Sequence, residues 1–117
     1  MLASYQALVR FLLPEGILDY FDLSNVVETR TGLHIYLDEK NLPPAEYNDQ
    51  KLESKGFLPE IAVQDFPIRN QRVTLYIKRR RWEVKKTGAI ISRAWNGVQQ
   101  GTRMTKEFAA FLKEVYR

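Results

Sequence analysis

The chain of 117 residues contains no cysteine and a single histidine, His34. Without cysteine there is no disulfide framework, and one histidine cannot supply a zinc site built from four Cys/His ligands. Long apolar runs are also missing, because Gln6 and Arg10 interrupt the leading segment. No membrane span or signal peptide is therefore predicted, and the expected location is the cytoplasm.

The chain also has few features typical of a catalytic centre. It has no cysteine nucleophile and no glycine-rich phosphate loop, and its acidic residues are spread through the chain rather than clustered. Asp38 and Glu39 are adjacent, but neighbouring strand residues point to opposite faces. We expect no catalytic residue, no metal site, no cofactor and no enzymatic activity from this chain by itself.

Charge is unevenly distributed along the sequence. The net charge of +4 combines a front part, residues 1–66, with 5 Lys/Arg against 11 Asp/Glu, and a remainder, 67–117, with 13 against 3. This asymmetry fits a polyanionic partner for the basic part. It fits equally well a fold in which the acidic part neutralises the basic part.

Apolar spacing predicts helices at both ends of the chain. Residues 1–22 carry apolar side chains at helical intervals, with Pro14 between two short helices. Residues 105–117 repeat this spacing behind Thr105, a good N-cap residue. No stop signal ends this helix, so it either docks on the sheet or belongs to a larger system.

Between these helices the apolar period changes to two, which predicts strands. Residues 26–40 are predicted to form a hairpin, residues 41–56 a surface loop, and residues 57–96 three antiparallel strands. The predicted fold class is α+β, in one domain over residues 1–117. It comprises an antiparallel sheet of two hairpin units, about five strands in all, with N-terminal helices and one C-terminal helix.

A strongly basic hairpin follows residue 77. With Thr87-Gly88 as a two-residue turn, Trp82 would pair with Arg93, and arginine–tryptophan contacts would brace a ribbon with both faces in water. Such ribbons can enter a DNA groove, and their cations would contact phosphates. The predicted nucleic-acid-binding residues are Lys78, Arg79, Arg80, Arg81, Trp82, Lys85, Lys86, Arg93 and Arg103.

Three alternatives to DNA binding stay open. The charges of the hairpin could simply protect a solvated strand edge from aggregation. The chain could be a protein-interaction module that docks a catalytic subunit or associates with itself through its two oppositely charged parts. It could also bind RNA by stacking bases on Tyr76, Trp82 and Trp95.

Six short motifs carry a resemblance to a known family. They are LPEGILDYF (13–21), LHIYL (33–37), KGF (55–57), QDFP (64–67), IKRRRW (77–82) and GTRMTKEF (101–108). Together they resemble the N-terminal region of bacterial insertion-sequence transposases of the ISAon type. The last three motifs also resemble the zinc-ribbon-like segment of ISL-type transposases, without its cysteines.

This resemblance implies a region that recognises DNA ends beside a catalytic transposase subunit or domain of the metal-dependent, acidic-triad kind. Where the zinc-containing relatives have a Cys-x-x-Cys knuckle, this chain has residues 82–88, WEVKKTG. Tryptophan packing would then have to replace metal ligation. The predicted function is a non-catalytic, DNA-binding accessory region of a transposase.

Overall fold

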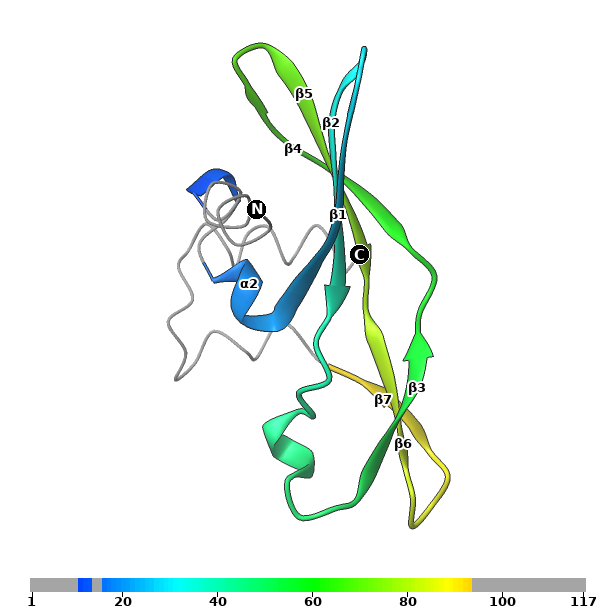
Figure 1. Ribbon diagram of the computed structural model, residues 1–117. Helices are drawn as coiled ribbons and strands as arrows, with labels where there is room; N and C mark the ends of the chain where they lie inside the picture. The colour runs from blue at the N-terminus through cyan, green and yellow to red at the C-terminus, as the bar shows by residue number, and fades with distance from the viewer. Residues whose placement is uncertain (1–10, 14–15, 94–117) are drawn as a thin grey trace.

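The computed structural model describes residues 11–13 and 16–93. Its central feature is one long, kinked hairpin (Figure 1). Strands β4 (Ile61–Ile68) and β5 (Gln71–Lys78) pair in antiparallel orientation around a tight turn. Beyond a break, the same two chain segments pair again as β3 (Leu52–Phe57) and β6 (Arg80–Val84). The Leu58 N–H donates to the Arg79 carbonyl at 2.7 Å, so the strands stay connected across the break.

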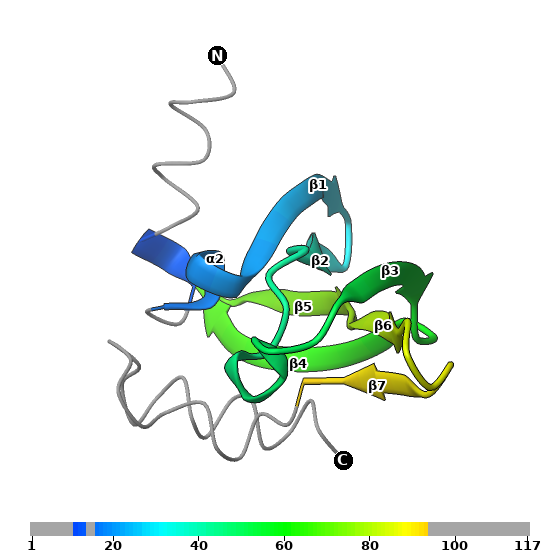
Figure 2. The ribbon, with the colours of Figure 1, turned by 90° about the horizontal axis from the view of Figure 1, so that it is seen from below.

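Additional strands widen each end of this hairpin into a sheet. At one end β1 (Phe21–Thr29) and β2 (Gly32–Glu39) form a second hairpin, and β2 lies parallel to β5, which gives sheet A the order β1-β2-β5-β4. At the other end β7 (Ile90–Ser92) joins β6, which gives sheet B the order β3-β6-β7. The two sheets lie end to end, and Figure 2 views them along their common axis.

The predicted α+β fold class is wrong, because the described residues are mainly β-structure. They form seven strands in two sheets rather than one antiparallel sheet of about five, and one strand pair is parallel. The only α-helix bounded wholly within them is α2 (Ile17–Tyr20), with one further 3₁₀ turn, η1 (Ala45–Tyr47). The helix expected over 105–117 lies outside the described residues, as do residues 1–10 of the expected N-terminal helices.

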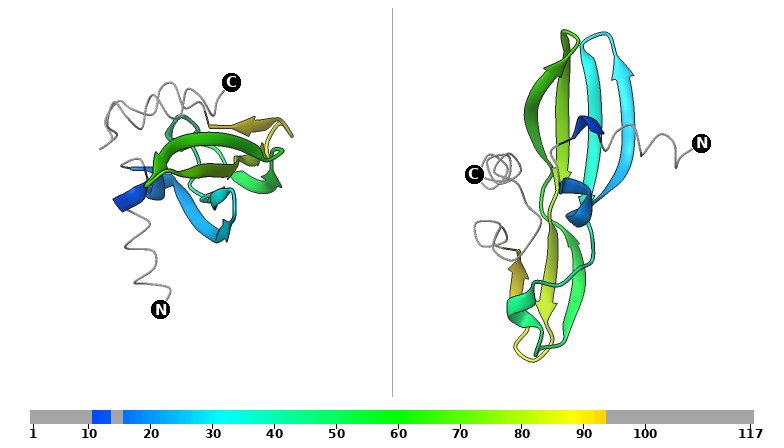
Figure 3. Two further views of the ribbon diagram at one scale, coloured as in Figure 1. Left: turned by 90° about the horizontal axis from the view of Figure 1, so that it is seen from above. Right: turned by 90° about the vertical axis from the view of Figure 1, so that its left-hand side faces the viewer.

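The apolar face of sheet A forms the main core. Alternate side chains of β2 and β5, among them Ile35, Leu37 and Leu75, are fully buried on this face. Ile17 of α2 and Phe21 of β1 pack against them, and Figure 3 (right) looks onto the face that α2 covers. The alternation of period two is therefore the direct cause of the sheet, because it gives one continuous apolar face to bury.

The alternation of inward and outward residues is reset at Arg79. In β5 the inward positions are odd-numbered, ending at Ile77, whereas in β6 the buried positions are Trp82 and Val84. The single residue between the strands, Arg79, is not part of either ladder. Arg81 has an odd number, like the buried positions of β5, but because of this reset it lies on the outer face of sheet B.

Two further differences from the sequence expectation concern strand limits. Strand β3 occupies residues 52–56 of the expected loop, and the first hairpin begins at Phe21 rather than residue 26. The polar residues of β3 explain the first difference, because they alternate on a face that is solvated. Among the helices of the described residues, none has the length and apolar character needed to cross a membrane.

Candidate nucleic-acid interface

The inner face of sheet B is a small, closed core. Trp82 is 0% exposed, and its indole Nε1 donates to the Asn41 side-chain oxygen at 2.9 Å. Val84 lies beside it, and Leu52 pairs with Val84 on the neighbouring strand. The sequence predicted a ribbon with both faces in water. That prediction is wrong, because one face of the hairpin is buried.

A buried carboxylate joins sheet B to sheet A. Glu39, at the end of β2, is 1% exposed and accepts hydrogen bonds from the Arg80 backbone N–H at 2.9 Å and from Arg93 Nε at 3.0 Å. The Arg80 Nε also donates to the Glu39 carbonyl at 3.0 Å. Burial raises the pKa of the Glu39 carboxyl, and these hydrogen bonds and the Arg93 charge oppose that rise.

The same two arginines lie over aromatic rings. The Arg80 guanidinium carbon is 4.7 Å from the centre of the Phe57 ring, and that of Arg93 is 5.1 Å from the centre of the Tyr20 ring. The Arg93 Nη2 donates to the Leu42 carbonyl, and Arg80 Nη1 donates to the Ser54 hydroxyl at 2.5 Å. These two cations are thus committed to the internal structure, not to a partner.

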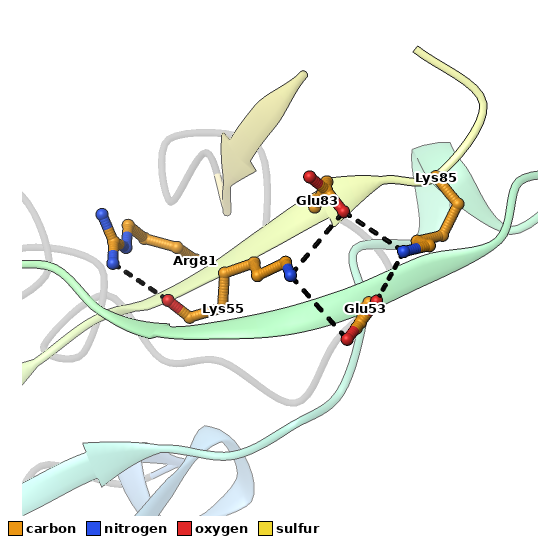
Figure 4. Close-up of polar contacts among 5 residues, drawn as sticks. All are labelled: Glu53, Lys55, Arg81, Glu83 and Lys85. Atoms are coloured by element: carbon orange, nitrogen blue, oxygen red, sulfur yellow. Dashed lines mark hydrogen bonds and ion pairs between the residues drawn. The ribbon is translucent and has the colours of Figure 1, made fainter. Parts of the chain in front are cut away.

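The outer face of sheet B carries the cations that face solvent (Figure 4). We define this outer face by Glu53 and Lys55 on β3, Arg81 and Glu83 on β6, and Lys85 at the start of the turn. The Lys85 ammonium lies 2.8 Å from Glu53 and 3.4 Å from Glu83, and the Lys55 ammonium lies 3.8 Å from both. The two lysines therefore share two carboxylates across neighbouring strands.

Glu53 is the counter-ion most affected by this arrangement. The hydrogen bond from Lys85 lowers the pKa of the Glu53 carboxyl, and the nearby charges of Lys55 and Lys51 add to the effect. The same contact with Glu53, with a further one from Glu83, raises the pKa of the Lys85 ammonium. Lys51 therefore belongs electrostatically to the outer face of sheet B, although it precedes β3.

Arg81 is anchored to the neighbouring strand on this face. Its Nη2 donates to the Lys55 carbonyl at 3.0 Å. Its Nε is buried and makes no hydrogen bond within the part of the chain that the structure describes. A guanidinium carries five N–H donors in a fixed fork that suits a phosphate.

The structure separates the predicted binding residues into four described groups and one residue outside the described ranges. Arg80, Trp82 and Arg93 are turned inward, and Lys78 lies on sheet A. Arg81, Lys85 and Lys86 belong to the outer face of sheet B or the turn beside it, and Arg79 stands at the break between strands. The last, Arg103, lies outside the described residues.

The strand register of the basic hairpin also differs from the expectation. Trp82 pairs with Ile91 and Arg81 with Ser92, so the strands are shifted by two residues from the pairing of Trp82 with Arg93. The reason is the turn. The Val84 N–H donates to the Ala89 carbonyl at 2.8 Å and the Gly88 N–H donates to the Val84 carbonyl at 2.7 Å, so residues 85–88, rather than two residues, form the turn. A shift of two leaves each side chain on the face expected for it.

Two basic residues of the outer face, Lys51 and Lys55, were not predicted from the sequence. They lie in the segment that was expected to be a loop. The sequence pattern that could have indicated a strand here is the alternation of Leu52 and Ser54 with Glu53 and Lys55. The first two side chains are half-buried, and the other two are exposed and charged. Only two of those four residues are charged and only one is strongly apolar, so the pattern is weak.

Charge is also divided between the two sheets. Residues 40–57 and 79–93, which build sheet B and its connections, contain nine Lys/Arg and four Asp/Glu. Residues 16–39 and 58–78, which build sheet A and its connections, contain four Lys/Arg and seven Asp/Glu. Within residues 16–93, the uneven distribution seen along the sequence is thus a polarity between the two sheets, with the positive end at sheet B.

Within the described ranges, no group of three or more His, Cys, Asp or Glu residues is arranged to hold a metal ion. Comparison with known proteins gives no match to the chain among family models, curated proteins or solved structures.

Proposed function

We propose that this chain is a non-catalytic, nucleic-acid-binding module whose outer face of sheet B contacts phosphates. The observation that carries the proposal is the cation set Lys51, Lys55, Arg81 and Lys85, which lies beside the carboxylates Glu53 and Glu83 at the positive end of the described residues. Lys86 in the adjoining turn is exposed and adds to this set. Cations spaced over two strands suit the regular phosphates of a nucleic acid.

The two carboxylates set the strength of this contact. Each lysine that turns to a phosphate must leave Glu53 or Glu83, which lowers the net gain. Binding of this kind orients a polyanion and has moderate affinity, and it carries no sequence information by itself. The resemblance to transposase N-terminal regions supports DNA as the nucleic acid. It also supports a catalytic transposase subunit as the protein partner of this chain.

The test is fluorescence polarisation with a labelled 20-base-pair duplex over a series of salt concentrations. Replacing Lys55 and Lys85 by Gln should weaken binding and reduce the log–log salt slope by about 0.9 for each phosphate that is no longer neutralised. Replacing Glu53 and Glu83 by Gln should strengthen binding, because the lysines are then freed from their internal competitors.

The matched control is the double variant Arg30→Gln and Arg69→Gln, which removes two charges from the turns of sheet A farthest from sheet B (Figure 1). It should bind as the unaltered protein does. Equal losses of affinity in the control and in the lysine variant would show that net charge, rather than this face, governs binding. Absence of binding to both the duplex and a single strand of the same sequence at low salt would remove the proposal altogether.

A further inference from the structure

The face of sheet A opposite α2 carries a preformed stack of aromatic rings. Tyr36 on β2 lies directly beside Tyr76 on the parallel strand β5, with ring centres 4.6 Å apart and planes inclined by 11°. His34 lies near the same ring, 5.7 Å between centres at 30°. All three side chains are half-buried, so part of each ring remains accessible.

Hydrogen bonds hold these rings in place. The Tyr76 hydroxyl lies 2.9 Å from His34 Nδ1, and the Thr29 hydroxyl lies 3.0 Å from His34 Nε2. The chain Thr29, His34, Tyr76 therefore restrains the tyrosine ring from one end while Tyr36 restrains it from the side. A ring that is already ordered loses little conformational entropy when a ligand stacks on it.

On the side of β5 away from Tyr36, the neighbouring strand β4 offers almost no side chain at the position paired with Tyr76. Across β4, the residue paired with Tyr76 is Ala62, which is exposed and contributes only a methyl group. Strands are about 4.8 Å apart, which is close to the spacing of stacked aromatic rings. A planar ring placed over Ala62 would therefore continue the stack that Tyr36 and Tyr76 begin.

Groups that could recognise the edge and backbone of such a ligand lie on the same face. Gln64, two residues along β4, is exposed and uses its amide Nε2 to donate to the Val73 carbonyl, which leaves its oxygen available as an acceptor. Lys78, two residues beyond Tyr76 on β5, is half-buried on this face. The position over Ala62 is thus flanked by an acceptor and by a cation, which the register places beside Asp38 of β2.

This face and the outer face of sheet B lie on the same side of the molecule. The helix α2 covers the other face of sheet A. The 3₁₀ turn η1 follows the loop that is hydrogen-bonded to Trp82 and Arg93 on the inner face of sheet B. Both elements lie on the same side of the strands, opposite these two faces (Figure 1). From Tyr76 to Arg81 the chain advances five residues, or about 16 Å of strand. One extended single strand can therefore reach both faces.

We infer that the aromatic face, defined by His34, Tyr36, Ala62 and Tyr76, stacks unpaired bases of a single-stranded nucleic acid whose phosphates reach sheet B. The inference rests on the proposed function for its phosphate contacts. The acidic balance of sheet A argues that the aromatic face contributes base stacking and that most of the charge attraction comes from sheet B. Single-stranded rather than duplex substrate follows, because paired bases expose no flat face.

The test compares labelled 12-nucleotide single strands with a duplex of the same sequence at low salt. Tyr76→Leu should weaken single-strand binding by about 5- to 150-fold, the range for loss of one stacked base, and should leave duplex binding unchanged. Tyr76→Phe, which keeps the ring, should bind nearly as the unaltered protein does. An abasic 12-mer should bind no better to the unaltered protein than to Tyr76→Leu.

A second variant avoids any dependence on the folding of Tyr76→Leu. Ala62→Val fills the position beside Tyr76 at an exposed site on an edge strand and leaves the tyrosine pair intact. It should reduce single-strand binding without lowering the melting temperature. DNA and RNA strands of equal sequence distinguish the two sources of unpaired bases, since a 2′-hydroxyl contact would favour RNA.

The two proposals fail in different ways. If neither duplex nor single strand binds at low salt, the proposed function itself is wrong. If duplex binds and the Lys55 and Lys85 variant weakens it, but Tyr76→Leu and Ala62→Val bind single strands normally, only the aromatic face is overturned. A single strand that binds no more tightly than the duplex also overturns it.

Discussion

At the scale of single residues, Glu39 links the two sheets. It lies at the end of a strand of sheet A, and its carboxylate accepts hydrogen bonds from two arginines of the chain segment that builds sheet B. A buried charge is tolerated only where its hydrogen bonds are satisfied. Glu39 is satisfied by a backbone N–H and a guanidinium, so removal of its side chain would leave Arg93 buried without that carboxylate.

Glu39→Ala should lower the free energy of unfolding by about 3–5 kcal/mol, the usual result of removing one partner of a buried ion pair. Glu39→Gln should lower it by less than half as much. The amide oxygen keeps an acceptor for the Arg80 backbone N–H, so one of the two hydrogen bonds can be retained. Urea unfolding monitored by circular dichroism measures both values, and equal losses of stability in the two variants would contradict this account.

Glu53 and Lys85 stabilise each other's charged forms on the surface. Because the Glu53 pKa is lowered, its contribution to stability is present above the unfolded value of 4.5 and is lost as pH falls through the folded pKa. Lys85→Met should move the Glu53 pKa upward, since the hydrogen bond from Lys85 is the largest cause of the shift. Carboxyl-carbon NMR titration measures it directly, with Lys86→Met as the control that leaves Glu53 unchanged.

Residue-level prediction from sequence works where one physical rule decides the outcome. The alternation of Val73, Leu75 and Ile77 correctly indicated buried strand positions. The burial of Trp82 was missed because the many nearby cations suggested a solvated ribbon, and a sequence does not show that Asn41 lies within bonding distance of the indole. Long-range partners of this kind depend on the topology, which local patterns do not specify.

At the scale of elements, Gly32 decides whether β2 can join β5. Its φ of 142° lies where side chains are rarely accommodated, and a Cβ there would come within van der Waals overlap of the Arg72 backbone carbonyl oxygen. Gly32 and Arg72 are the first pair of the parallel ladder. A side chain at this position would separate the two strands at the point where their pairing begins.

Gly32→Ala should therefore be strongly destabilising, by about 1–3 kcal/mol for backbone strain and a similar amount for the overlap. Gly88→Ala is the matched control, since Gly88 has a φ of 77° but no atom lies within 4 Å of the added Cβ. It should show the strain alone, about 1–2 kcal/mol. Thermal unfolding of both variants gives the comparison, and a smaller loss of stability for Gly32→Ala would refute the role assigned to it.

Elements were predicted from sequence where their partners are close in the chain. Two of the three strands expected over residues 57–96 are joined by a tight turn at Arg69 and Asn70, whose φ values of 50° and 66° suit a two-residue hairpin turn. The parallel pairing of β2 with β5 was not predicted, because its partners are some forty residues apart and parallel strands have no turn signal between them. Strand β3 was missed because one of its faces is charged and the other is only half-buried.

At the scale of the whole molecule, the long hairpin makes the two sheets one mechanical unit. Two continuous chain segments run from sheet A into sheet B, and the hydrogen bonds of Glu39 join the sheets beside them. Separate unfolding of sheet B would expose Trp82 and Val84 and would also break the Glu39 contacts. We therefore expect the two sheets to unfold together.

A variant with Trp95→Phe, outside the described residues, leaves Trp82 as the only tryptophan. In this variant, Trp82 fluorescence reports on sheet B, and far-ultraviolet circular dichroism reports on strands of both sheets. The two urea transitions should coincide. A fluorescence transition at clearly lower urea would show that sheet B unfolds first and that the Glu39 contacts do not couple the sheets.

The reset at Arg79 has a consequence for how this sequence can vary over evolutionary time. Because a single residue outside the ladders sets the phase between β5 and β6, gaining or losing one residue there would exchange the two faces of everything that follows up to the turn. Trp82 would then point to water, and Arg81 would enter the core. Length changes of two residues would preserve the phase, so homologous chains should differ at this point by even numbers of residues or not at all.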